Sequence, residues 1–204
     1  MSEYHKINSI YKRDKDTNKF IFGDYAQEEF AYLANNVWEF TEKVDGTNIR
    51  VMWNGETVTF GGRTDNAQIP AKLVTYLQAT FTPEKMSFVL PEGGVLYGEG
   101  YGAGIQKGGG NYGATQQFVL FDVKVGSWWL RRDDVNDIAG KLAIRSVPII
   151  GHGSLADGIE MVKTGIQSQW GDFAAEGIVA RPLVTLFDRR GDRIIVKIKY
   201  RDFK

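Results

Sequence analysis

The chain has 204 residues, of which 43% are hydrophobic, enough to bury a substantial core. Its 25 basic and 25 acidic residues balance to a net charge of zero, which excludes a protein coated in positive charge but leaves room for a local basic patch. The absence of cysteine excludes disulfides and thiolate metal sites. No apolar run reaches the ~18 residues of a membrane span, and the N-terminus has no apolar signal segment, so we expect a soluble, cytoplasmic protein.

The first predicted element in the chain is a β-hairpin. Its strands, residues 48–53 and 56–60, are rich in β-branched and aromatic residues and are joined by Asn54-Gly55, a pair that favours a type I′ turn. A helix is expected over residues 70–80, with its proline in the first turn. Two apolar strands follow, at residues 94–98 and 117–125.

The second half of the chain adds two helices and a final pair of strands. Asp133 or Asp134 is expected to cap a helix that ends near Leu142. Ser154 is expected to cap another, closed by Gly165. The last strands are predicted at residues 177–180 and 193–200, around a turn near Arg190-Gly191. Strands dominate and βαβ alternation is weak, so the sequence predicts an α+β fold with largely antiparallel sheets.

The most informative segment is Glu42-Lys-Val-Asp-Gly-Thr-Asn48. A lysine followed by Asp-Gly is, in isolation, most often part of a solvated surface turn. The same arrangement suits a nucleophilic lysine at the end of a rigid strand, with Gly46 allowing the backbone to approach a phosphate. Both interpretations stay open on this segment alone.

Further segments place a charged or aromatic side chain next to a predicted strand. They are Tyr97–Gly100, Phe118–Asp122, Ala175–Arg181 and Ile195–Lys199. Taken singly, they are explained by an edge charge, a core aromatic, a turn acid and the wet face of an amphipathic strand. In the last segment, alternation puts Lys197 and Lys199 on one side of the strand. These separate explanations leave the order and spacing of the segments unexplained.

In this order the segments resemble motifs I, III, IIIa, IV and V of the lysine-dependent nucleotidyltransferases, which include polynucleotide ligases and mRNA capping enzymes. The matched ranges are Lys43–Asn48, Tyr97–Glu99, Phe118–Asp122, Glu176–Val179 and Val196–Lys199. The Gly-rich stretch Gly98–Lys107 is similar to the RNA ligase 2-like branch, which includes RNA-editing ligases. The resemblance runs from about Trp38 to the C-terminus. It implies a nucleotidyltransferase domain of two twisted antiparallel sheets flanked by helices.

The resemblance also implies catalytic roles. Lys43 would be the nucleophile that takes AMP from ATP, and its amine must be neutral to attack the α-phosphate. Lys197 and Lys199 would clamp that phosphate and neutralise charge in the transition state. Glu176 would be the acid on the metal side, and Asp122 is a second candidate ligand for Mg²⁺ or Mn²⁺.

Nucleotide-binding roles follow from the same match. The backbone of Glu42 would read the adenine amino group, and Glu99 would hold the ribose hydroxyls. Phe121 and Val179 would contact opposite faces of the adenine. Arg63 matches an arginine that contacts a phosphate, and Asn48, the last residue of motif I, completes the set.

The activity implied is ATP-dependent RNA ligation. The expected partner is RNA with 5′-phosphate and 3′-hydroxyl ends, nicked duplexes included, with no membrane partner. We expect a monomer and a single adenylyltransferase domain, residues 1–204, without a separate C-terminal domain. Thr41 stands where related enzymes often have an arginine, two residues before the nucleophile.

The sequence leaves three alternatives to an RNA ligase open. A GTP-dependent capping guanylyltransferase usually has Lys-x-Asp-Gly-x-Arg, whereas this chain has Asn48 at the last position. The Gly-Ile-Gln-Lys segment favours a ligase and also counts against a DNA ligase. A non-catalytic nucleic-acid-binding relative is the alternative from another class, and the intact lysines and acids of all five motifs count against it.

Basic residues concentrate at the end of the chain. From residue 181 onward, eight basic residues, Arg181, Arg189, Arg190, Arg193, Lys197, Lys199, Arg201 and Lys204, stand against three acids, Asp188, Asp192 and Asp202. A solvated hairpin explains this pattern. If the substrate is RNA, however, Arg189 and Arg190 are expected to belong to a weak, salt-sensitive RNA-binding patch.

Overall fold

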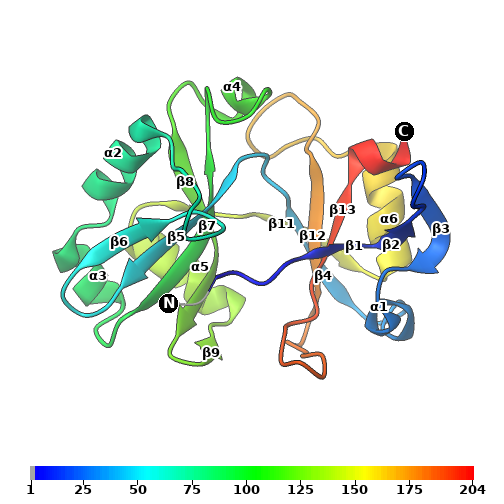
Figure 1. Ribbon diagram of the computed structural model, residues 1–204, viewed down its shortest axis with the longest axis horizontal. Coiled ribbons are helices and arrows are strands. Elements are labelled where there is room, and N and C mark those ends of the chain that lie inside the picture. Colours follow the sequence, from blue (N-terminus) through cyan, green and yellow to red (C-terminus); the bar gives the residue numbers. More distant parts are fainter. Residues whose placement is uncertain (1–2) are drawn as a thin grey trace. The chain divides into compact units, whose positions relative to one another are not determined.

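The computed structural model describes residues 3–204, which form two compact units (Figure 1). The central unit comprises residues 3–4 and 45–147, and the terminal unit comprises residues 5–44 and 148–204. The lysine motif spans a boundary between them, since Lys43 belongs to the terminal unit and Asp45 to the central unit. That the whole chain acts as one adenylyltransferase domain stays a prediction.

The central unit is built on a sheet with the strand order β10-β8-β7-β5-β6. Its strands are β5 (Thr47–Trp53), β6 (Val58–Gly61), β7 (Gly94–Tyr101), β8 (Gln117–Val125) and β10 (Arg145–Ser146), with β9 (Trp128–Trp129) paired to β8. All pairings are antiparallel except β10 with β8. The helices of this unit are α2 (Ala71–Thr80), α3 (Pro83–Val89), α4 (Gly109–Tyr112) and α5 (Arg132–Lys141).

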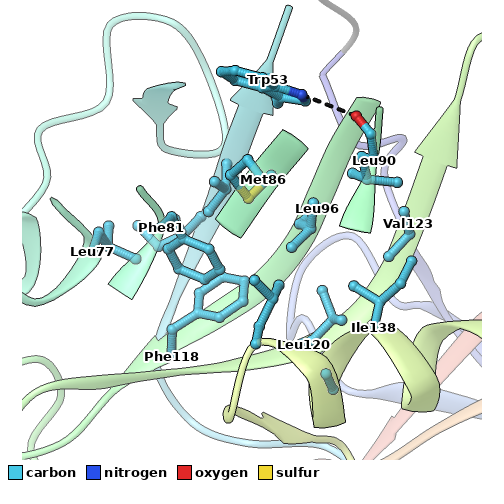
Figure 2. Close-up of a cluster of buried hydrophobic side chains, with 14 of the residues drawn as sticks. Trp53, Leu77, Phe81, Met86, Leu90, Leu96, Phe118, Leu120, Val123 and Ile138 are labelled. Carbon is cyan, nitrogen blue, oxygen red and sulfur yellow. Dashed lines mark hydrogen bonds between the residues drawn. The ribbon is translucent and has the colours of Figure 1, made fainter. Parts of the chain in front are cut away.

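One face of this sheet packs against α2, α3 and α5 and forms the core of the central unit. Alternate residues of β5 are buried there, among them Ile49 and Trp53. Figure 2 shows Phe81 against Phe118, edge to face with ring centroids 5.3 Å apart, and the indole N–H of Trp53 donating to the Leu90 carbonyl at 2.9 Å. The opposite face of the same strands is therefore left for polar side chains.

The terminal unit has a second sheet with the order β1-β13-β12-β4-β11. Its strands are β1 (Asn8–Ser9), β4 (Trp38–Glu42), β11 (Ile149–Gly153), β12 (Gly177–Pro182) and β13 (Val196–Lys199). Only β1 is parallel to its neighbour, β13. A separate hairpin consists of β2 (Tyr11–Arg13) and β3 (Phe20–Tyr25), and the helices are α1 (Glu28–Tyr32), α6 (Leu155–Thr164) and the 3-10 helix η1 (Tyr200–Phe203). Two largely antiparallel sheets with flanking helices confirm the predicted α+β class.

The first predicted hairpin is confirmed, but its turn type is wrong. Gly55 has a φ of 95°, whereas a type I′ turn also needs a positive φ at Asn54, which has none. The Asn54 side chain instead accepts hydrogen bonds from the backbone N–H groups of Glu56 and Thr57, at 2.9 and 2.7 Å. This side-chain turn lengthens the loop, so β6 begins at Val58.

The helix ends also differ in part from expectation. Helix α5 has Arg131 at its N-cap, so neither Asp133 nor Asp134 caps it; both lie in its first turn, where the helix dipole favours acids. The Ser154 cap of α6 is confirmed, as is the Gly165 terminus, where φ is 91°. No helix within residues 3–204 is long and apolar enough to span a membrane.

Candidate active site

Lys43, Glu176 and Lys199 meet in the terminal unit. Strand β4 ends at Glu42, and the Lys43 N–H donates to the Gly177 carbonyl at 2.9 Å, which fixes the lysine beside the start of β12. One carboxylate oxygen of Glu176 lies 2.6 Å from Lys43 Nζ, and the other lies 2.6 Å from Lys199 Nζ. The side chains are 20%, 12% and 15% exposed for Lys43, Glu176 and Lys199. Glu176 thus bridges two mostly buried ammonium groups.

Lys197 and Val179 lie on the same face of this sheet. Val179 pairs in register with Lys197 on β13 and with Thr41 on β4, and residues directly opposite one another in antiparallel strands project from the same side. Their neighbours Ile178, Val196 and Ile198 project from the other face and are fully buried in the core of this unit. The predicted alternation of Lys197 and Lys199 is confirmed. We call Lys43, Glu176, Lys197 and Lys199 the lysine cluster.

The electrostatics of the lysine cluster favour an anion. Burial alone would raise the pKa of Glu176, but the ammonium groups of Lys43 and Lys199 outweigh burial and hold the pKa below its ordinary value. The carboxylate is therefore ionised at neutral pH and neutralises one of the two lysines that it contacts, Lys43 and Lys199. The surplus positive charge at the end of a rigid sheet suits a phosphate.

Glu42, the residue before Lys43, has a buried side chain that contacts the segment at Ser168 and Gln169. It is 1% exposed and accepts hydrogen bonds from Ser168 Oγ at 2.5 Å and from the Gln169 N–H at 2.8 Å. Burial outweighs these hydrogen bonds and raises its pKa. Thr41, which stands where related enzymes often have arginine, is also buried, and its hydroxyl donates to the Val179 carbonyl at 3.2 Å. Ser168 carries no motif signal, so the sequence alone did not indicate it.

A second set of predicted residues lies on the polar face of the central sheet. Asn48 and Glu99 are directly paired on β5 and β7. A register shift on β8 leaves Phe121 without a directly opposite residue, between Leu120, which pairs with Gly98, and Asp122, which pairs with Tyr97. Such a bulge re-aims a side chain, as bulges beside functional sites often do. Phe121 is half-buried, whereas Leu120 and Val123 on either side of the bulge enter the core.

Asn48 carries an unsatisfied polar atom. Its Oδ1 is buried and accepts no hydrogen bond within residues 3–204. An unpaired buried oxygen is costly, so this position calls for a donor from a ligand or water. The orphaned oxygen on the same face as Glu99 fits the prediction that these residues bind a nucleotide.

Arg50 positions the loop that carries Arg63. Arg50 is fully buried, and its guanidinium donates to the Gly62 carbonyl at 2.8 Å and to Asp65 at 2.6 Å. Arg63, between these two partners, is exposed. Alternation along β5 puts Arg50 on the polar face of the sheet, and this alternation can be read from the sequence. The hydrogen bonds of Arg50 with Gly62 and Asp65 cannot be read from it.

Gly46 has a packing role in the lysine motif. A Cβ atom at this position would collide with the Gly100 carbonyl and would lie 2.8 Å from Cγ of Glu99. Only glycine therefore allows the start of β5 to pass this close to β7. The structure shows Gly46 packed closely against the backbone of Gly100, beside Glu99. That Gly46 also lets the backbone approach a phosphate stays a prediction.

The predicted metal ligands lie in different units. Asp122 is 3% exposed and accepts a hydrogen bond of 2.5 Å from the Tyr4 hydroxyl, and the Tyr4 ring packs edge-on against Phe121 with centroids 5.2 Å apart. Both Glu176 oxygens contact lysines. Within residues 3–204, no group of three or more His, Asp or Glu side chains is arranged to hold a metal ion. Sequence reasoning missed Tyr4, which precedes every motif.

A profile of the RNA ligase family matches residues 36–199. No curated protein sequence matches the chain significantly. Among solved structures, an apo aspartate-to-alanine variant of Naegleria gruberi RNA ligase is similar at a TM-score of 0.68 and 19% identity, over 86% of this chain and 53% of that one. A lysine-to-methionine variant of the same ligase, solved with AMP and Mn, has a TM-score of 0.66 at 19% identity, over 84% of this chain and 52% of that one.

A lysine-to-alanine variant with ATP and Mn matches 99% of this chain and 63% of its own length, at a TM-score of 0.68 and 18% identity. This chain therefore spans between about half and two thirds of the ligase it matches, 52% to 63%. At these identities the similarity shows the fold, which confirms the nucleotidyltransferase architecture expected from the motifs.

Proposed function

Because this chain belongs to the RNA ligase family, we propose that it is the catalytic part of an ATP-dependent RNA ligase of the RNA ligase 2-like branch. The observation that carries the proposal is the lysine cluster, in which Glu176 joins Lys43 and Lys199 at 2.6 Å each on one face of a sheet. A mostly buried cluster with surplus positive charge and a lysine that follows a strand end match what covalent nucleotidyl transfer needs. The substrate proposed is RNA with a 5′-phosphate and a 3′-hydroxyl.

The proposed reaction begins when Lys43 Nζ attacks the α-phosphorus of ATP. A P–N bond forms, the P–O bond to pyrophosphate breaks, and the amine loses its proton. An RNA 5′-phosphate oxygen then attacks the same phosphorus, so a P–O bond forms and joins AMP to the RNA through a pyrophosphate linkage. The P–N bond breaks, and Lys43 Nζ takes up a proton and leaves as the amine. Finally the 3′-hydroxyl of a second end attacks the RNA 5′-phosphate, loses its proton and releases AMP.

Each residue of the lysine cluster has a proposed part in these steps. Lys197 and Lys199 would neutralise charge on the α-phosphate as it becomes five-coordinate. Glu176 orients Lys43 before ATP binds, and their contact has to be given up, or the proton passed on, before the amine can attack. The rigid pairing of β12 with β13 keeps these groups in place.

The central unit would recognise the nucleoside. We assign the ribose hydroxyls to Glu99, a polar ligand group to the orphaned oxygen of Asn48, and an adenine face to Phe121. The motif match assigns adenine contacts to Val179 and the Glu42 backbone, and a phosphate contact to Arg63. These roles rest on the motif match together with the unsatisfied oxygen of Asn48.

We propose that a divalent cation, Mg²⁺ or Mn²⁺, accompanies ATP. Such an ion would shield the phosphates and stabilise the pyrophosphate that leaves. Glu176 is one carboxylate beside the proposed phosphate site, and Mg²⁺ is commonly held by one or two carboxylates together with substrate phosphates. The residues therefore fit an ion that arrives with the nucleotide better than one held in a prebuilt cage.

The proposal is tested by covalent labelling. The protein is incubated with Mg²⁺ and each α-labelled nucleoside triphosphate, denatured and examined for label and for added mass. Label from ATP, carried on Lys43, is expected. Lys43→Ala and Lys43→Arg should abolish it, whereas Lys72→Ala, at an exposed lysine of α2, should label like the wild type.

Other outcomes identify the alternatives. Label from GTP alone would indicate a capping-type guanylyltransferase, and the absence of label with every triphosphate would indicate a non-catalytic nucleic-acid-binding relative. If ATP labels the chain, sealing assays with nicked RNA and nicked DNA separate an RNA ligase from a DNA ligase. Retention of label by the folded Lys43→Ala variant would refute the assignment of the nucleophile.

A further inference from the structure

The terminal unit contains a pocket that the motifs do not account for. Its volume is about 390 Å³, and its lining residues are Phe22, Lys163, Tyr200, Phe203 and Lys204. They come from β3 of the small hairpin, from the last turn of α6 and from the segment at and after η1. Of these residues, only Lys163 lies within the range matched by the family profile, 36–199. We call this site the aromatic–lysine pocket.

The aromatic side of the pocket includes a largely exposed ring, that of Phe22, beside the half-buried ring of Phe203. Phe22 and Phe203 stack with centroids 5.9 Å apart and an interplanar angle of 29°. Phe22 is 63% exposed, whereas Phe20, two residues earlier on the same strand, is 7% exposed in the core. The hairpin therefore buries one phenylalanine and holds the next against Phe203 without covering it. A planar group could stack there and remove apolar surface from water.

The other side of the pocket is cationic. Lys163 Nζ lies 5.6 Å from the ring centroid of Phe203, and Lys204 Nζ lies 4.2 Å from that of Tyr200. Neither ammonium group forms an ion pair within the described part of the chain. The nearby acid of η1, Asp202, is held instead by Arg13 at 2.8 Å. The pocket thus combines the exposed ring of Phe22 with two ammonium groups that have no carboxylate partner among residues 3–204.

We propose that the aromatic–lysine pocket binds a nucleotide of single-stranded RNA, with a base on Phe22 and Phe203 and a phosphate near Lys163 and Lys204. Aromatic faces beside basic side chains are the combination that grips single strands, because every base has a π-face and every linkage a charge. The choice of RNA rests on the proposed function. Although η1 follows Lys199 directly in the chain, Tyr200 and Phe203 pack with the core that includes α6, so the pocket is a site separate from the lysine cluster.

Binding without catalysis tests this proposal. The probe is a fluorescently labelled, eight-nucleotide single-stranded RNA with a 5′-hydroxyl, and its anisotropy is measured at low salt without ATP or divalent metal. Phe22→Ala and Lys163→Ala should each weaken binding by about fivefold or more. Phe22→Trp and Lys163→Arg should retain it, because they keep the ring face and the charge.

Matched controls are available on the same protein. Phe187→Ala removes another exposed phenylalanine of the terminal unit, 53% exposed, and Lys72→Ala removes an exposed helical lysine. Both should bind like the wild type. A blunt RNA duplex of the same length should compete more weakly, because its bases are already stacked. Thermal melting of every variant verifies that it is folded.

Several results would overturn the proposal. These are absence of measurable binding by the wild type, unchanged affinity in both Phe22→Ala and Lys163→Ala, or equal competition by the duplex. A dimer that Phe22→Ala dissociates, seen by size-exclusion chromatography, would show that a second copy covers the pocket instead. Wild-type lysyl-AMP formation is measured separately. If lysyl-AMP does not form but RNA still binds in a way that depends on the pocket, the proposed function is refuted and the proposal of RNA binding at the pocket is not.

Discussion

Two glutamates of the terminal unit, Glu42 and Glu176, show how neighbouring groups set opposite charge preferences. Glu176 is mostly buried, which by itself raises its pKa, but Lys43 and Lys199 lower the pKa below the ordinary value of 4.5. Glu42 is buried with hydrogen bonds from Ser168 and Gln169 only, and burial prevails, so its pKa is raised above 4.5. Folding therefore favours the ionised form of Glu176 and disfavours the ionised form of Glu42.

These shifts predict opposite dependences of stability on pH. Because the pKa of Glu176 is lowered on folding, its ionised form contributes stability above pH 4.5, which is lost as the pH falls through the folded-state pKa. Because the pKa of Glu42 is raised, its ionisation removes stability as the pH rises from 4.5 through the folded-state pKa. The measurement is the melting temperature of Glu176→Gln and Glu42→Gln, each against the wild type, from about pH 2 to 7, a range that includes pH values on both sides of 4.5.

With rising pH, the wild type should gain stability relative to Glu176→Gln and lose stability relative to Glu42→Gln. Each variant is the other's control, since both replace a glutamate of the terminal unit by an amide of the same shape. If the melting temperatures of the two variants changed with pH in the same way, the conclusion that ion pairs stabilise the carboxylate of Glu176 but not that of Glu42 would be contradicted.

At the scale of elements, α6 is tied down at its N-terminus by a reciprocal cap. Ser154 Oγ accepts from the Asp157 N–H at 3.2 Å, and the Asp157 carboxylate accepts from the Ser154 N–H at 2.8 Å. Ser154→Ala should lower the free energy of unfolding by about 1 kcal/mol. Ser154→Ala with Asp157→Ala should cost less than the sum of the single changes, because they share one cap.

Urea denaturation measures these changes. Ser87→Ala, at an exposed position inside α3, is the control and should shift the free energy of unfolding by less than about 0.5 kcal/mol. A full-sized loss in Ser87→Ala, or strict additivity of the two cap changes, would contradict the reciprocal cap.

Elements also show what the sequence could and could not predict. Alternation along β13 correctly put Lys197 and Lys199 on one face, because facing depends on neighbours within a strand. The residues of β8 carry no pattern that predicts the bulge at Phe121, because the bulge arises from the way β8 pairs with β7. The Asn54 turn was misassigned because a side-chain hydrogen bond replaced the backbone geometry that Asn-Gly usually favours.

At the scale of the whole molecule, topology explains the remaining misses. Glu42 and Ser168 are 126 residues apart, and Tyr4 and Asp122 are 118 apart, yet each pair is joined by a hydrogen bond. Contacts of this kind depend on how strands are ordered in a sheet, which local composition does not specify. The motif residues could be predicted because chemistry restricts their type, whereas their supporting partners are restricted only by proximity.

The same topology divides the basic residues that seemed to form one patch. Arg181 pairs with Glu39 at 3.0 Å, and Arg193 is buried. Arg190 makes an ion pair with Asp188 at 2.9 Å in the loop between β12 and β13. Gly177 pairs with Lys199 at one end of β12, and this loop leaves the other end, about 16 Å away at strand rise. The loop arginines are therefore separated from the lysine cluster by the length of the strand.

This division predicts which residues carry the salt dependence of RNA binding. The chain has no net charge, so attraction to RNA has to come from local cations, and each phosphate neutralised on a single strand contributes about 0.7 to the slope of log affinity against log salt. Lys163→Ala combined with Lys204→Ala should reduce the slope by up to about 1.4. Arg189→Ala combined with Arg190→Ala, which removes the same number of positive charges, should leave the slope unchanged, because one of the two is already paired and both lie at the far end of β12.

The slope is measured from anisotropy titrations of the single-stranded probe across a potassium chloride series. A smaller slope in the double-arginine variant, with an unchanged slope in the double-lysine variant, would mean that RNA follows the β12–β13 loop, as the run of basic residues in the sequence suggests.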